Sequence, residues 1–467
     1  MSAAGPMRVA ILDHYSAGGV SRFLFALVAH LADLKPEVSF SYFVSETNVV
    51  RDDLVATFAS HANVTIVPIR SAAPTAPPSD VDEPQVHGVL WRTAVGLLKK
   101  MPRVHAFLRD GFVSARESVS SAGSQPWYRY QVDEDVRARI AQHDVLYIGW
   151  PFYVEPFDAG VPLVATFHDF HFKHFPESYV PEQLATVERQ TPEWLRRCTI
   201  AVTSTEYIKS ELLHYYGPIA PQVDVVFIAP YGFDAPDQAV IEDAIARYAI
   251  TPPYVLYSGA RTAHKNVAGL VRAVALLRDA GTPVQLVITG HDPDIIGTDR
   301  DSGPDDPVHL INAAIEQTEL ARGSGYRALG YVSNEDVDAL TVGANAVVSA
   351  SLYEAGCGPA LDAWQAGVPV AFSDIPPFVE QTQRFGVEAH VFDPYDPADI
   401  AKKLHAAVFD VADSRAMAQR SRDALARYTW EDAARGYWDV LARAAGGEAA
   451  AASRDAREGE SADAPMV

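Results

Sequence analysis

Short apolar runs alternate with amphipathic stretches along most of the chain. Such runs, rich in β-branched side chains, are typical of strands that are buried on both faces of a sheet. They occupy residues 7–13, 64–67, 145–148, 200–203, 284–289, 346–349 and 368–372. Strands that alternate with helices favour parallel sheets wound by helices, in which ligands bind at the carboxyl ends of the strands. The pattern therefore predicts an α/β protein.

The alternation divides into two halves. Residues 1–235 are expected to form one Rossmann-like domain, and residues 236–430 a second one, entered through the prolines of 251–253. A helix over 431–445 is expected to pack back on the first domain, and the alanine-rich, polar residues 446–467 have the composition of a disordered tail. With 467 residues and 48% hydrophobic content, the chain can bury two cores.

Residues 71–126 depart from this pattern. Residues 71–84 and 117–126 have turn-like composition, and a helical insertion near 85–115 lies between them, with basic residues along 86–112. One interpretation is a contact with a membrane surface or a lipid-linked acceptor. The other is a helix packed on the first domain, with its cations extended into water.

Charge and cysteine content narrow the functional class. The formal net charge of −22 would repel a nucleic-acid backbone. Two cysteines, Cys198 and Cys357, provide no disulfide framework, and the sequence contains no run of 18 apolar residues and no signal peptide. A cytoplasmic enzyme is expected, with a peripheral contact at the inner face of the membrane as an alternative.

The stretch from residue 351 to residue 380 contains a pair of acidic residues around a glycine-bearing turn. Glu354 and Asp362 lie eight positions apart, and Gly356, Cys357 and Gly358 lie between them, before a helix expected over 360–366. Such a turn presents backbone N–H groups and the positive end of a helix dipole, which favour sugar hydroxyls or phosphate. Alternatively, the two carboxylates are a helix cap and a solvated helical charge.

This stretch resembles the acidic signature of retaining nucleotide-sugar glycosyltransferases of family 4. The matching positions are Ser351, Glu354, Pro359, Ala363, Gly367, Pro369 and Val370. Gly356 and Gly358 each lie one position later than in the family, and Asp362 replaces its second glutamate. The resemblance implies that Glu354 holds the donor sugar together with backbone N–H groups near Gly356 and Cys357. It also implies that Asp362 binds the ribose.

A second motif, over residues 254–266, places Arg261 and Lys265 before a helix expected over 267–279. Cations at the start of a helix oppose its dipole unless an anion also binds there. A lysine exposed to water in a loop is the alternative. The motif resembles the pyrophosphate site of the same family, which implies that both cations neutralise the diphosphate leaving group.

Two motifs fall in the first half. Gly18 and Gly19 follow the apolar run 7–13 and precede a helix through Leu31, and glycines there let a ligand approach the backbone. This turn resembles the family's glycine pair between donor and acceptor. His168 and Asp169 end the apolar run 161–167, resembling a family segment whose histidine contacts the transferred sugar. One alternative is a packed or surface histidine. Another is a metal site, but the spacing fits no zinc pattern.

Together, these resemblances imply the GT-B fold, two facing Rossmann-like domains with a cleft between them. The implied function is retaining transfer of a hexose, of the mannose or glucose type, from a nucleotide-diphosphate sugar to a saccharide or lipid-linked acceptor, in polysaccharide or glycolipid biosynthesis. No cofactor or metal is expected. The nucleotide base is expected near Gly290, Tyr331 and Val332.

Two alternatives remain. One is a non-catalytic nucleotide-sugar-binding protein of the same fold that acts as a complex partner, favoured by Asp362 and the displaced glycines. The other is a phosphorylase, which would need a pyridoxal phosphate lysine; no lysine in the sequence has that setting.

Overall fold

The computed structural model describes residues 6–14, 19–45, 57–69, 130–232, 235–290, 295–298, 307–329 and 332–446. The chain divides into two compact units, residues 1–71 with 132–467 and residues 72–131. The helical insertion expected near 85–115, the turn residue Gly18, Tyr331 and the tail from residue 447 lie outside the described residues.

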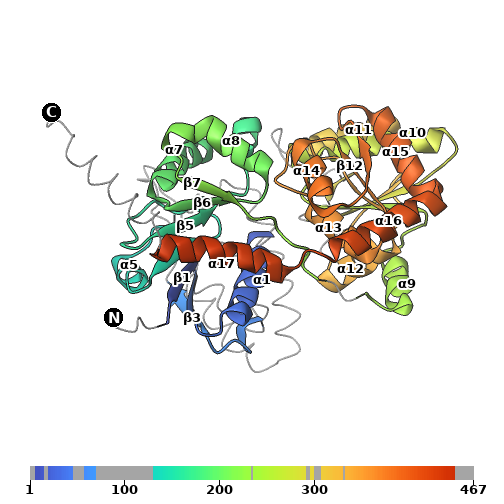
Figure 1. The fold of residues 1–467 in the computed structure, drawn as a ribbon. Coiled ribbons are helices and arrows are strands. Elements are labelled where there is room, and N and C mark those ends of the chain that lie inside the picture. The colour runs from blue at the N-terminus through green and yellow to red at the C-terminus, as the bar shows by residue number, and fades with distance from the viewer. Residues whose placement is uncertain are drawn as a thin grey trace, which may run out of the picture. The chain divides into compact units, whose positions relative to one another are not determined.

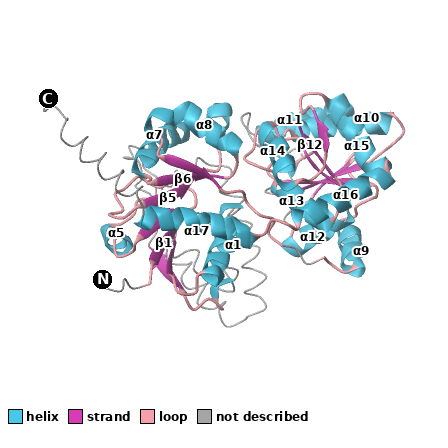
Figure 2. Cartoon of the chain, viewed as in Figure 1, coloured by secondary structure: helices cyan, strands magenta, loops and turns pink. Residues whose placement is uncertain are grey.

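The first sheet has seven parallel strands in the order β3-β2-β1-β4-β5-β6-β7. These strands are β1 (Arg8–Asp13), β2 (Ser39–Ser45), β3 (Val64–Ile69), β4 (Val145–Ile148), β5 (Leu163–Thr166), β6 (Ile200–Thr203) and β7 (Gln222–Val225). Strands β4, β5 and β6 are buried along their whole length because helices cover the sheet, as Figure 2 shows.

The helices that cover the first sheet include the last helix of the described chain. They are α1 (Gly19–Leu34), α5 (Glu134–Ile140), α6 (His171–His174), η1 (Pro176–Ser178), α7 (Pro181–Arg197), α8 (Glu206–Tyr216), η2 (Gly217–Ile219) and α17 (Trp430–Gly446). Helix α17 packs beside α1, as Figure 1 shows. Its Tyr437 is fully buried, and the Tyr437 hydroxyl lies 3.2 Å from Thr166 Oγ1 on β5.

The second sheet has six parallel strands in the order β10-β9-β8-β11-β12-β13. These strands are β8 (Tyr254–Ser258), β9 (Gln285–Thr289), β10 (Tyr326–Ala328), β11 (Ala346–Ser349), β12 (Val370–Ser373) and β13 (His390–Phe392). Its helices are α9 (Gln238–Arg247), η3 (Ala263–Lys265), α10 (Val267–Asp279), α11 (Val308–Thr318), α12 (Asn334–Gly343), α13 (Gly358–Ala366), α14 (Pro376–Phe385), α15 (Pro397–Phe409) and α16 (Val411–Leu425).

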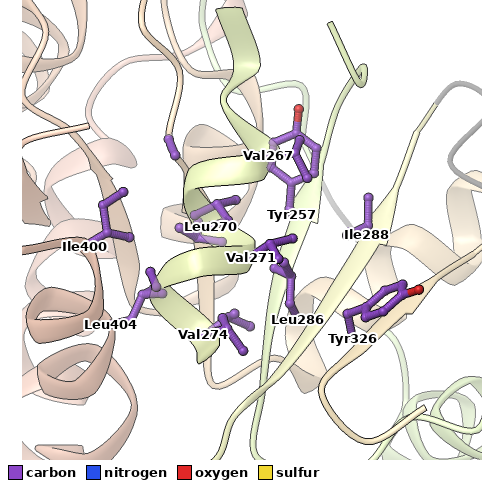
Figure 3. Close-up of a cluster of buried hydrophobic side chains, with 14 of the residues drawn as sticks. Tyr257, Val267, Leu270, Val271, Val274, Leu286, Ile288, Tyr326, Ile400 and Leu404 are labelled. Atoms are coloured by element: carbon purple, nitrogen blue, oxygen red, sulfur yellow. The ribbon is translucent and has the colours of Figure 1, made fainter. Parts of the chain in front are cut away.

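Helix α10 is central to the core of the second sheet. Its Leu270 and Val274 are buried between Ile400 and Leu404 of α15 and the strand residues Leu286 and Ile288, as Figure 3 shows. The predicted helix over 267–279 is confirmed with the same bounds. The α/β class with parallel sheets is confirmed as well.

Both sheets contain a topological switch point. The first strand of the second sheet, β8, lies between β9 and β11. The chain continues from β8 through β9 to β10 on one side, and then returns to add β11, β12 and β13 on the other side. Strand β1 lies in the same way between β2 and β4. In open α/β sheets, ligands bind at the carboxyl ends of the strands beside such a point. A ligand site is therefore expected at the loops after β8 and β11.

Two glycines allow the carboxyl ends of β8 and β9 to approach each other. Gly259 follows β8, and Gly290 follows β9 with φ +136°. A Cβ atom at Gly290 would overlap the carbonyl group of Gly259, so a side chain does not fit without movement of the backbone. Only glycine combines this φ with this close approach.

We therefore expect Gly290→Ala to lower the free energy of unfolding by about 3 kcal/mol or more, from backbone strain and overlap together. The matched control is Gly281→Ala, because Gly281 also has a positive φ of +80° but open space around its Cβ position. The control should cost about 1–2 kcal/mol. Urea denaturation measures both values, and equal losses would contradict the close approach.

Candidate active site

The loops after β8 and β11 lie side by side because these two strands are hydrogen-bonded neighbours, with Val347 beside Leu256. The backbone N–H of Leu352 donates a hydrogen bond of 2.7 Å to the carbonyl of His264, which ties the loops together. Arg261 and Lys265 come from the first loop and Glu354 from the second. The structure thus brings the basic motif and the first acidic residue to one place.

Lys265 and Glu354 form an ion pair through Nζ and Oε1. Ser351, which is fully buried, donates a further hydrogen bond of 2.8 Å to Glu354 Oε1. The side chains of Lys265 and Glu354 are 22% and 17% exposed, so both remain accessible at the end of the sheet. A cation and a carboxylate held this way can bind phosphate oxygens and hydroxyl groups of one ligand.

The position of Lys265 depends on Asn266. Asn266 adopts the left-handed conformation, with φ 52° and ψ 40°, and its side chain accepts a hydrogen bond of 3.2 Å from the N–H of Gly269. It thereby caps α10. Its amide also donates a hydrogen bond of 2.7 Å to the carbonyl of Pro394. The cap fixes the chain immediately after Lys265.

The glycine-bearing turn is braced by Gln381 of α14. The N–H of Cys357 donates a hydrogen bond of 2.9 Å to Gln381 Oε1, so this N–H, expected at the donor sugar, is engaged within the protein. Burial raises the pKa of the Cys357 thiol to about 12, which keeps it neutral. Gly358 begins α13, and a Cβ there would meet nothing within 4 Å. Gly356 lies between Glu354 and this helix.

Asp362 lies on α13 and faces a cation from the first domain. Arg22 of α1 places Nη1 at 3.6 Å from Asp362 Oδ2, while its guanidinium lies 4.1 Å from the centre of the Tyr231 ring. Burial raises the pKa of Asp362, and the charge of Arg22 opposes that shift. Asp362 Oδ1 is buried without a hydrogen-bond partner among the described residues. It is an acceptor that a ligand hydroxyl would satisfy.

His168 and Asp169 follow β5 directly. The ring of Phe23 on α1 meets the His168 ring edge to face, with centroids 5.0 Å apart. Burial lowers the pKa of His168 to about 4, and a hydrogen bond to the backbone of Gly149 opposes this shift. The imidazole is therefore neutral near pH 7. Its Nε2 is buried without a hydrogen-bond partner among the described residues.

Asp169 links this strand end electrostatically to the second sheet. Burial raises its pKa to about 6, the His171 N–H that donates to Oδ1 at 3.0 Å lowers it, and the charge of Glu354 raises it. Lys265 lowers its pKa in turn. Asp169 therefore lies within the electrostatic reach of the pair formed by Lys265 and Glu354.

The second glycine of the predicted glycine turn, Gly19, begins α1.

Several contacts at the site were not predicted from the sequence. Arg22 has no motif of its own, although it follows the glycine pair by one helical turn. A hydrogen bond of 2.8 Å joins Nε2 of His171 to Nδ1 of His264. Burial lowers the pKa of both imidazoles, to about 4 and about 2. The Tyr353 hydroxyl, beside Glu354, donates a hydrogen bond of 2.6 Å to Glu211 Oε2, a further contact that the sequence did not predict.

Two features are absent from the described part of the chain. Within it, no group of three or more His, Cys, Asp or Glu side chains is arranged to hold a metal ion. None of the helices described there combines the length and apolar character needed to cross a membrane.

Comparison with known proteins finds a family match over the second sheet and its helices. Residues 241–424 match the family model described as Glycosyl transferases group 1. The O-antigen chain mannosyltransferase B of Escherichia coli is 26% identical over 297 residues, covering 62% of this chain and 72% of that protein. The predicted resemblance to nucleotide-sugar glycosyltransferases is thereby confirmed.

Solved structures confirm the GT-B fold. Anabaena HepE, crystallised with UDP and glucose, matches with a TM-score of 0.59 at 14% identity, covering 93% of this chain and 99% of that one. The sucrose-phosphate synthase of Thermosynechococcus elongatus matches with a TM-score of 0.57 at 16% identity, covering 94% and 98%.

The shifted pKa values predict how stability depends on pH. Between its folded pKa of about 4 and its ordinary value of 6.5, His168 binds a proton only in the unfolded chain, so stability falls as the pH falls through this window. His171 and His264 act in the same direction. Asp169, with a pKa of about 6 against 3.8, acts in the opposite direction. The histidines outnumber it.

We expect the free energy of unfolding to fall between about pH 6.5 and about pH 5, and His168→Gln to make this fall shallower. Urea denaturation across that window measures the slope. The exposed His214→Gln is the control for loss of an imidazole. An unchanged slope in His168→Gln would contradict the buried, neutral state of His168.

Proposed function

We propose that this protein is a retaining hexosyltransferase that moves mannose or a related hexose from a nucleotide-diphosphate sugar to a saccharide or lipid-linked acceptor. The observation that carries the proposal is the convergence of Lys265 and Glu354 beside the switch point of the matched domain. The mannosyltransferase relative supports mannose as the first sugar to test. We place the reaction in polysaccharide or glycolipid biosynthesis, on the cytoplasmic side of a membrane.

In this proposal, Arg261 and Lys265 bind the diphosphate. Negative charge on the leaving group grows as the glycosidic bond breaks, so fixed cations stabilise the transition state more than the ground state. Because these cations stand where a divalent ion would otherwise act, the proposed reaction needs no metal. Lys265 is held for this task by Glu354 and by the next residue, Asn266, which caps α10.

Glu354 orients the donor sugar through its hydroxyls. Neutral His168 offers Nε2 to the sugar from the side of the first domain, and Asp362 offers Oδ1 to the ribose. In a retaining reaction of this kind, the acceptor attacks from the face that the leaving group vacates, and the departing phosphate takes the acceptor's proton. The side chains then mainly position the reactants and stabilise charge.

The function is tested by incubating the purified chain in EDTA with GDP-mannose, GDP-glucose, UDP-glucose and ADP-glucose, with and without saccharide acceptors. Release of the nucleoside diphosphate, together with an NMR spectrum of the product, shows turnover and anomeric configuration. We expect turnover with retention. Inversion, or activity only with an added divalent ion, would contradict the mechanism.

A second candidate is a non-catalytic nucleotide-sugar-binding protein that acts as a complex partner. Asp362 in place of a glutamate and the displaced Gly356 and Gly358 favour this candidate. It predicts thermal stabilisation by a donor without turnover. A ligand at 100 times its Kd adds about 2.7 kcal/mol of stability, which a thermal-shift screen detects.

Loss of a cation that binds the diphosphate leaving group should strongly lower kcat. We expect Lys265→Ala to lower kcat by roughly 100-fold or more, which is the effect of removing one strong charge-stabilising donor. Arg261→Ala should act similarly. The exposed Lys402→Ala is the control for loss of a lysine from the same domain. A folded Lys265→Ala enzyme with unchanged kcat would remove the diphosphate assignment.

The two acidic residues should separate kinetically. Asp362→Ala removes a charged acceptor from the ribose, worth roughly 1.5–3 kcal/mol per hydrogen bond in ground and transition states alike, and should mainly raise the donor KM. Glu354→Ala should mainly lower kcat, because Glu354 orients the sugar that moves. The exposed helical Asp423→Ala is the control. Small, equal effects of Asp362→Ala on both parameters would contradict the ribose contact.

A further inference from the structure

A buried carboxylate on α8 connects both sides of the candidate site, and the proposed mechanism leaves it unused. Glu211 is 7% exposed. Its Oε2 accepts a hydrogen bond of 2.6 Å from the hydroxyl of Tyr353, the residue immediately before Glu354. Its Oε1 accepts a hydrogen bond of 3.1 Å from the hydroxyl of Tyr207 and pairs with Nε2 of His174. Every oxygen of this carboxylate is engaged.

Tyr353 carries the connection from the second sheet to the first. Its hydroxyl accepts a hydrogen bond of 2.9 Å from the N–H of Phe170, the residue immediately after Asp169. Its ring stacks on His174 of α6, with centroids 4.3 Å apart and planes inclined by 25°. The side chain is 5% exposed. One hydroxyl group therefore joins the chain beside Glu354 to the chain beside His168 and Asp169.

A second carboxylate fixes the start of the helix that carries Glu211. Glu380 of α14 accepts hydrogen bonds from the N–H groups of Glu206 and Tyr207, at 2.6 Å and 2.9 Å. These are the first residues of α8, where a negative charge is favourable. Helix α8 is thus held by Glu380 at its start and through Glu211 one turn further along. Glu211 has a fixed place from which to hold Tyr353.

We propose that Tyr353 and Glu211 are positioning residues that hold Glu354 in register with His168 and Asp169 during sugar transfer, an inference that rests on the proposed function. Neither residue needs to touch the substrate. Without the Tyr353 hydroxyl, Glu211 Oε2 and the Phe170 N–H lose their partner in a buried place, so the turn before Glu354 and the end of β5 are no longer tied. Displacement of a reacting group by about 1 Å costs roughly 100-fold in rate.

The test is a double-mutant cycle with Tyr353→Phe, Glu211→Gln and the combined variant. Tyr353→Phe keeps the stacked ring and removes only the hydroxyl, and Tyr395→Phe, at a residue that is 75% exposed, is the matched control. We expect each single change to lower kcat by roughly 10- to 100-fold. The combined variant should be no slower than the slower single variant, because both changes break one connection.

The Kd for GDP or UDP, measured by calorimetry, should stay within about twofold of wild type in each variant, since Arg261, Lys265 and Asp362 are untouched. General damage to the fold would change this Kd together with kcat. Should one variant fail to fold, the other still tests the connection. A folded Tyr353→Phe or Glu211→Gln enzyme with wild-type kcat, or additive losses in the combined variant, would overturn the positioning role. A wild-type chain inactive with every donor would instead refute the proposed function.

Discussion

The ion pair between Lys265 and Glu354 is the interaction on which the rest of the candidate site depends. It exists because β8 and β11 are parallel neighbours at a switch point, so their carboxyl ends open at the same edge of the second sheet. The hydrogen bond from Leu352 to His264 sets the distance between the two loops. Charges of opposite sign then meet in a partly exposed place, where a ligand with phosphate and hydroxyl groups can reach both.

The first domain completes this arrangement through buried polar groups that must find partners. His168 is kept neutral by burial, and Asp169 has a raised pKa because it is buried near the charge of Glu354. Tyr353 and Glu211 satisfy each other and the backbone of Phe170. A buried polar network of this kind specifies one arrangement, since any displacement leaves a charged or polar group unpaired. The same requirement connects the geometry of the donor turn to that of β5.

The sequence predicted those strands and helices that have a strong local pattern of apolar residues. Strands β4, β6 and β11 are confirmed at the predicted positions, because each is a short and largely apolar run. Helix α10 is confirmed because its apolar residues recur on one stripe, at Leu270, Val274 and Leu277. The three-residue strands β10 and β13 were not predicted, because Arg327 and His390 interrupt the apolar pattern. Their strand character depends on pairing with β9 and β12.

Some residues of the candidate site were predicted from the sequence, and others were not. Motif resemblance predicted Lys265 and Glu354, and the structure places them in contact. The motifs did not predict the ion pair of Arg22 with Asp362, or the hydrogen bond that the Cys357 N–H donates to Gln381. These pairs depend on tertiary packing between distant segments. Glu211 is a helical glutamate like many others in the sequence. Its role follows only from its burial beside Tyr353.

A crystal structure of the chain with GDP or UDP bound tests the assignment of the donor site most directly. We expect the diphosphate within hydrogen-bonding distance of Lys265 and Arg261, and the ribose against Asp362 Oδ1, at the carboxyl ends of β8 and β11. A nucleotide bound away from these residues, or with its ribose and diphosphate positions exchanged, would contradict this assignment.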